Sequence, residues 1–131
     1  MNFNLSPGLK AEKTEPVTTD NTARKFGSGA VAVYATPAMV GLMEGACVAI
    51  ADHLLPETMA TVGTDLNIKH LAATPVGMTV RAVAELTGID GRRLIFNVEA
   101  FDNKEQIGSG THERYIINTE KFLQKTEAKL N

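Results

Sequence analysis

TPAMVGLMEGACVAIA, residues 36–51, is the stretch that decides the fold. Thr36 suits a helix N-cap, and Pro37 suits the first helical turn, where its missing N–H would be unpaired in any case. Every residue from Ala38 to Ala51 is apolar or glycine except Glu44. A helix that is apolar on all sides is a buried helix, so we expect other elements to surround it.

Segments of strand character flank this helix. Residues 9–19 alternate well enough for a first strand, and residues 20–35 are polar and glycine-rich, as expected of a loop or a flap over a site. Four further strands are predicted at 58–73, 78–87, 92–101 and 106–118. Asp90-Gly91 is a hairpin signal between two of them, and the tail 119–130 has a weakly helical pattern.

The predicted order is strand, loop, one buried helix, then a four-stranded antiparallel meander. An antiparallel sheet wrapped around one central helix explains why that helix needs no polar face. The sequence therefore predicts an α+β hotdog fold in a single domain, residues 1–131.

Composition excludes several function classes. The net charge is −2 and there is no tryptophan, so no basic footprint for nucleic acid is present. No apolar run is long enough to cross a bilayer, and the start of the chain lacks the pattern of a signal peptide. Cys47 is the only cysteine, so we expect neither a disulfide framework nor a metal site, and the cytoplasm is the expected compartment. A chain of 131 residues has little room for a deep pocket, which favours a site between two subunits.

Glu44 is the most informative residue. It is the only charge in the apolar helix, and burying a carboxylate is costly unless it is paired or hydrogen-bonded. It lies eight residues, about two turns, after Thr36. A structural hydrogen bond at a subunit interface would also explain it, but we favour a role in chemistry.

His70 and Thr36 are the other candidates. Alternation places Val62, Thr64, Leu66, Ile68 and His70 on one apolar face, towards the helix. A core histidine with satisfied hydrogen bonds and a general acid or base both fit that position. Thr36 needs to do no more than cap the helix, but a hydroxyl beside free backbone N–H groups could also hold a thioester carbonyl.

Other chemistry-bearing residues give weaker signals. Cys47 is expected to be inert packing, and neither His53 nor His112 has carboxylates at metal-ligand spacing. Gly108-Ser109-Gly110 lies inside a strand pattern, which is typical of a bulge or a close backbone approach. The basic residues that could meet coenzyme A phosphates are Arg24, Lys25, Arg92 and Arg93.

Several segments together resemble the fluoroacetyl-CoA thioesterase family. They are residues 34–44 (YATPAMVGLME), 62–64 (VGT) continuing to 69–77 (KHLAATPVG), 90–94 (DGRRL) and 107–114 (IGSGTHER). The resemblance runs from about residue 30 to the C-terminal end and keeps its spacing.

The resemblance implies a homodimeric hotdog thioesterase that hydrolyses an acyl-CoA to a free acid and CoA without a cofactor. It leaves two assemblies open, a dimer and a dimer of dimers. The family's catalytic residues would fall on Thr36, Glu44 and His70, and its substrate-binding residues on Gly63 and Arg114, with parts from both subunits. The fluoroacetate-specific member of the family carries aromatic residues in the lid before the catalytic threonine. Residues 27–33 here contain none, the nearest being Phe26 and Tyr34, so a short-chain acyl-CoA is the expected substrate.

Two other functions use the same features. A hotdog dehydratase or hydratase would employ the same histidine and carboxylate as acid and base. A non-catalytic acyl-CoA binding module would bind without turnover.

Overall fold

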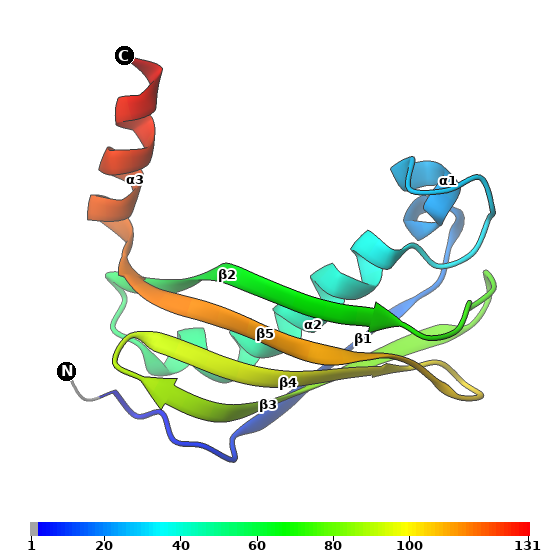
Figure 1. The fold of residues 1–131 in the computed structure, drawn as a ribbon, viewed down its shortest axis with the longest axis horizontal. Coiled ribbons are helices and arrows are strands. Elements are labelled where there is room, and N and C mark those ends of the chain that lie inside the picture. The colour runs from blue at the N-terminus through cyan, green and yellow to red at the C-terminus, as the bar shows by residue number, and fades with distance from the viewer. Residues whose placement is uncertain (1–2) are drawn as a thin grey trace.

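The computed structural model describes residues 3–131, in which one sheet packs against one long helix (Figure 1). The strands are β1 (Lys10–Pro16), β2 (Met59–His70), β3 (Thr79–Asp90), β4 (Arg93–Phe101) and β5 (Gln106–Asn118). The α-helices are α1 (Ala23–Phe26), α2 (Thr36–Ala51) and α3 (Thr119–Glu127), with short 3-10 turns at Thr19–Asn21, Asp52–Leu54 and Ala128–Leu130.

The sheet is antiparallel throughout, in the order β1-β3-β4-β5-β2. This confirms the predicted fold class, with a strand before the long helix and four strands after it. The predicted four-stranded meander is wrong in its first step: β3, β4 and β5 form a consecutive meander, but β2 lies beside β5 rather than beside β3. The segment between β2 and β3 contains Pro75 and is too long for a tight hairpin, so it carries the chain across the sheet. As a result β1 and β2 are the two edge strands.

The core lies between α2 and the inward face of the sheet. Alternate residues of β3 and β4 point inward and are fully buried, and those of β3 include the small Ala82 and Ala84, which let the helix approach closely. The helix buries Met39, Leu42, Met43, Ala46, Cys47, Ile50 and Ala51 on this side.

One side of α2 is not covered within the chain, contrary to the prediction of a helix buried all round. Pro37, Gly41 and Ala49 are exposed, and a methyl group added at Gly41 would meet nothing within 4 Å. At Gly45 the neighbour is the Lys13 side chain, 3.1 Å from an added Cβ, rather than another backbone. The residues of this uncovered stripe are apolar and small.

A β-bulge in β2 changes which side chains face the helix. Gly63 pairs with Arg114 and Asp65 pairs with Glu113, so Thr64 is the extra residue. Before the bulge the inward residues are Thr61 and Gly63, and after it they are Leu66, Ile68 and His70, because residues paired across strands point to the same face. The predicted inward positions of Val62 and Thr64 are therefore wrong, while that of His70 is confirmed.

The glycines of β5 allow two close approaches, as their position within a strand predicts. A Cβ at Gly108 would lie 2.6 Å from the Met39 sulfur, and one at Gly110 would overlap the backbone of Asn67 in β2. Gly110 excludes any side chain, which keeps β2 close to β5, whereas a side chain at Gly108 would require the flexible end of Met39 to move.

Helix α3 leaves the end of β5 and points away from the sheet (Figure 1). Asn118 caps it by accepting a hydrogen bond from the Lys121 N–H.

The predicted loop 20–35 contains the short helix α1, which is followed by its C-cap Gly27 in the left-handed conformation. None of the described helices is long and apolar enough to span a membrane.

Candidate active site

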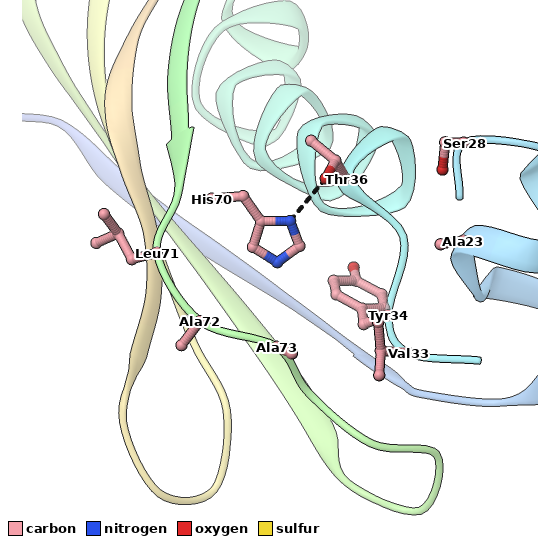
Figure 2. A pocket seen from close by; sticks show the side chains of 9 residues that line it. All are labelled: Ala23, Ser28, Val33, Tyr34, Thr36, His70, Leu71, Ala72 and Ala73. Carbon is pink, nitrogen blue, oxygen red and sulfur yellow. Dashed lines mark hydrogen bonds between the residues drawn. The ribbon is translucent and has the colours of Figure 1, made fainter. Parts of the chain in front are cut away.

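Thr36 and His70 form a hydrogen-bonded pair at the start of α2. The Thr36 Oγ1 lies 2.7 Å from the His70 Nδ1 (Figure 2). Thr36 is the first residue of the helix, and the N-cap is Ala35, which has no side-chain cap. The predicted capping role of Thr36 is therefore wrong. Its hydroxyl is committed to the imidazole instead, beside the helix terminus where the first backbone N–H groups lack helical partners.

His70 is the last residue of β2 and is held where the strand meets the helix. It pairs with Gly108 of β5, where an added Cβ would meet the Met39 and Met43 side chains of α2. Its Nε2 is buried and, among residues 3–131, has no hydrogen-bond partner of good geometry. Burial lowers the pKa of His70 below the usual 6.5, with the Ala72 backbone acting in the opposite direction. A neutral ring that carries its proton on Nε2 leaves Nδ1 free to accept the proton of the Thr36 hydroxyl.

The pair opens into a cavity of about 430 Å³. Its walls come from the loop before α2 on one side and from the end of β2 on the other (Figure 2). The other lining residues are Ala23, Ser28, Val33, Tyr34, Leu71, Ala72 and Ala73.

Tyr34 is the one aromatic side chain among these lining residues. Its hydroxyl donates a 2.5 Å hydrogen bond to Glu15 of β1, which fixes the ring, and burial together with Glu15 raises its pKa. Phe26, the other aromatic residue near the lid, is half exposed and does not line the cavity.

Glu44 lies in a second cluster, with Arg114, His112 and Gly63. Its Oε2 is 3.6 Å from the Arg114 Nη1 and 4.0 Å from the His112 Nε2. A Cβ added at Gly63 would lie 3.1 Å from the same oxygen, so only glycine leaves the carboxylate in place. The Glu44 side chain keeps 37% of its surface exposed, towards a hollow of about 260 Å³ that it shares with Gly63, Thr64, Asp65, Leu66 and His112.

Arg114 is buried and held by a network that starts at the end of α2. Its Nε donates to the Thr61 hydroxyl at 2.8 Å and its Nη2 donates to the Thr61 carbonyl at 3.0 Å. The Thr61 hydroxyl in turn donates to Asp52 at 2.6 Å. A buried guanidinium needs its donors satisfied, and this network satisfies the Nε and Nη2 side of the group.

The structure thus gathers the predicted residues into two groups, Thr36 with His70 and Glu44 with Gly63 and Arg114. The eight helical residues from Thr36 to Glu44 separate them by roughly 12 Å along the axis. Among the described residues, His70 has no contact with Glu44 of the kind it makes with Thr36.

His112 is the residue that sequence reasoning missed. Its spacing to Arg114 was the available signal, because positions two apart in a strand share a face. His112 was judged only as a metal ligand, but in the structure its partners are the Asp65 backbone carbonyl and the Arg114 guanidinium.

Apart from His112, the residues that gave weaker signals in the sequence lie outside these two groups. Cys47 is fully buried, and burial raises the pKa of its thiol to about 12, which confirms inert packing. Within residues 3–131 no three side chains of the metal-ligating types lie close enough to hold an ion. The four basic residues considered for coenzyme A line neither of the two hollows.

Comparisons with known proteins agree on one family. The model of the fluoroacetyl-CoA-specific thioesterase family matches residues 17–120. A fluoroacetyl-CoA thioesterase of Streptantibioticus cattleyicolor is 51% identical over 98 residues, which cover 74% of this chain and 70% of the relative.

Solved structures agree with the sequence comparisons. One of a fluoroacetyl-CoA thioesterase is 39% identical and superposes with a TM-score of 0.90 over 96% of this chain and 98% of the other. A variant of the fluoroacetyl-CoA-specific enzyme, in complex with fluoroacetate and CoA, is 40% identical with a TM-score of 0.86 over 90% and 99%. A hot-dog-like protein from Thermanaerovibrio acidaminovorans, 23% identical, shares the fold with a TM-score of 0.87 over 95% and 93%.

Proposed function

The chain belongs to the fluoroacetyl-CoA-specific thioesterase family, and from that premise we propose how its two residue groups divide the work of hydrolysis. It is a thioesterase, a hydrolase that converts an acyl-CoA to a free acid and CoA. The observation that carries the assignment of roles is the 2.7 Å contact between Thr36 and His70 at the start of α2.

His70 is the general base in this proposal. Its unprotonated Nδ1 takes the proton of the Thr36 hydroxyl, or of a water held at that hydroxyl, as the oxygen attacks the thioester carbonyl carbon. The C–S bond then breaks, and the departing thiolate takes up the proton that His70 received. Attack by Thr36 itself would leave an acyl group on its oxygen, which a water molecule then removes.

The helix start supplies the charge stabilisation. Pro37 has no N–H, so the backbone N–H groups of Thr36 and Ala38 are the donors that we propose for the oxyanion. One such donor is typically worth about 3–4 kcal/mol of the barrier.

The second half of the proposed active site consists of Glu44, Gly63 and Arg114. We propose that this half meets the Thr36–His70 pair of a second copy, so that the enzyme is a homodimer with composite sites. Three observations support this: the roughly 12 Å between the groups within one chain, the uncovered apolar stripe of α2, and the edge position of β2 with Leu66 half exposed beside Glu44. A measurement of the molecular mass in solution distinguishes a dimer from a dimer of dimers.

The proposed substrate is a short-chain acyl-CoA. The hollow beside Glu44 and Gly63 measures about 260 Å³, which suits an acyl group of a few atoms. The family and the relatives point to fluoroacetyl-CoA, but the lid residues 27–33 are free of aromatic side chains. We therefore propose that acetyl-CoA and other short acyl-CoA molecules are hydrolysed as well.

The reaction as proposed runs on the side chains of the protein, with coenzyme A as part of the substrate. The proposed compartment is the cytoplasm, because a single buried cysteine suits a reducing environment.

The test is hydrolysis of a short acyl-CoA panel by the wild type and by His70→Ala, with release of free thiol as the signal. We expect wild-type turnover and a loss of at least a hundredfold in the variant. Equal rates would remove His70 from the mechanism.

Crotonyl-CoA separates the two rival functions. Free thiol indicates hydrolysis, whereas loss of the enoyl absorbance without thiol would indicate a hydratase. Tight binding with neither signal, unaffected by Glu44→Gln, would indicate a binding module.

A further inference from the structure

His112 is a buried polar residue to which neither the family resemblance nor the proposed mechanism gives a role. It lies on β5, its side chain is 1% exposed, and it stands between Arg114 and the bulge of β2. Its ring also stacks near Phe96 of β4, which limits its rotation. A polar side chain so placed needs an account of both its ring nitrogens.

Each ring nitrogen has one partner, and the partners decide the tautomer. The Nδ1 lies 2.8 Å from the Asp65 carbonyl, which can only accept, so Nδ1 carries the proton. The Nε2 lies 3.0 Å from the Arg114 Nη1, which can only donate, so Nε2 is a bare acceptor. Burial is the main cause that lowers the pKa of His112, and it outweighs the opposing hydrogen bond to the Asp65 carbonyl; the Arg114 charge lowers the pKa further, and the Glu44 and Asp65 charges raise it. The net lowering agrees with a neutral ring.

This tautomer completes the hold on Arg114. The guanidinium donates to the Thr61 hydroxyl and carbonyl from one side and to His112 from the other. One Nη1 proton is used by His112, and the second is left on the side of the Glu44 carboxylate, 3.6 Å away. Removing His112 would leave that nitrogen with a free proton and an unfixed direction.

We propose that His112 is a positioning residue, a neutral imidazole that links the bulge of β2 to Arg114 and so directs Arg114 at Glu44. The bulge matters because it brings the Asp65 carbonyl to the ring. The inference rests on the proposed role of Glu44, through which His112 acts.

Two substitutions of His112 separate positioning from packing. His112→Met keeps the volume but offers Arg114 no good acceptor, whereas His112→Gln can place an amide oxygen near the position of Nε2. We expect kcat to fall about tenfold in His112→Met with KM changed less than threefold, and to be largely restored in His112→Gln. Both variants are measured at equal folded concentration, with unfolding midpoints recorded.

A double-mutant cycle with Glu44→Gln gives the decisive readout. If His112 acts through Glu44, His112→Met has little further effect on the residual rate of Glu44→Gln, so the two losses are not additive. The control is Ile116→Val, a buried neighbour on the same face of β5, which should lower the unfolding midpoint and leave kcat unchanged in both backgrounds.

The outcomes are distinct. Unchanged kcat in His112→Met, or additive losses in the cycle, would overturn the positioning role while leaving the proposed function intact. If Glu44→Gln itself keeps full activity, the role of Glu44 in the proposed function fails, and this inference fails with it. If His112→Met does not fold, His112→Gln in the same cycle decides: near-wild-type kcat supports the inference and a tenfold loss contradicts it.

Discussion

Thr36 and His70 are 34 positions apart in the chain, yet the hydroxyl of one and the Nδ1 of the other are 2.7 Å apart. The contact joins the first turn of α2 to the last residue of β2. The Thr36 hydroxyl bonds to the imidazole of His70 and does not cap helix α2. Loss of this hydroxyl should therefore affect the rate of hydrolysis much more than the stability of the helix.

Thr36→Val tests that separation. The variant keeps the shape and loses the hydroxyl, so we expect kcat/KM to fall by about 10²–10⁴ because the proton acceptor on His70 has nothing to activate. Since Thr36 does not cap the helix, the free energy of unfolding should change by less than about 0.5 kcal/mol, where loss of a true cap would cost ~1 kcal/mol. Thiol-release kinetics and urea unfolding measure the two quantities, and Thr36→Ser is the matched control that retains the hydroxyl.

The pH profile of kcat/KM should show one acid limb. The reaction needs neutral His70, whose pKa burial holds below 6.5, so activity should be constant at neutral pH and fall as pH drops through a value below 6.5. A limb centred well above 6.5 would contradict the assignment. The phosphate monoester of coenzyme A also ionises at about pH 6, so the pH profile of kcat, which reports the enzyme–substrate complex, is measured beside that of kcat/KM.

Stability should follow pH in the same direction. The pKa values of His70 and His112 are lower in the folded chain than the 6.5 of an unfolded one, so the unfolded state binds more protons between the two values. The free energy of unfolding should therefore be greatest above about pH 6.5 and fall as pH drops through the folded pKa values. His112→Gln should reduce that slope, and urea unfolding measured between about pH 5 and about pH 8 gives the slope for the wild type and the variant.

Gly63→Ala tests the crowding around Glu44. The added methyl would lie 3.1 Å from both the Glu44 carboxylate and the His112 ring, so the flexible carboxylate must move. We expect a loss of about tenfold in kcat/KM, with a small change in the unfolding midpoint.

Mixing two inactive variants tests the composite site. In a homodimer with shared sites, a heterodimer of Thr36→Val and Glu44→Gln has one site with both lesions and one intact site. Random exchange of subunits should then restore roughly a quarter of wild-type activity, since half the dimers are mixed and half their sites are intact. If the mixture stays as inactive as its parts, each site lies within one chain or subunits do not exchange, and unfolding and refolding the mixture together separates these cases.

The sequence predicted the features that rest on periodic patterns of apolar residues, and it missed the β-bulge, which depends on a single extra residue. The apolar run of α2 and the alternation of the strands are periodic, and they gave the fold class, the central helix and the inward position of His70. The extra residue at Thr64 breaks that period, and strict alternation counted back from His70 therefore put Gly63 on the outward face, which is wrong.

The site itself was predicted in parts. The lone carboxylate of Glu44 and the histidine on an apolar face were found because each violates the local pattern. The Thr36–His70 contact, the network of Arg114 and the role of His112 join residues far apart in the chain, and no local pattern contains such pairs.

The bulge at Thr64 reverses which alternate residues of β2 face the helix. On one side of it the even-numbered residues face outward, and on the other side they face the helix. Deleting Thr64 would restore a regular strand, but every residue on one side of the cut would then turn over, exposing either His70 or Gly63 to the wrong side. We therefore expect length changes in this strand to be far more damaging to the fold than substitutions at Thr64 itself, whose hydroxyl donates one hydrogen bond to the Glu113 carbonyl. In a library of random insertions and deletions, tolerance should drop sharply between residues 61 and 70 and recover in the surface turn at 102–105.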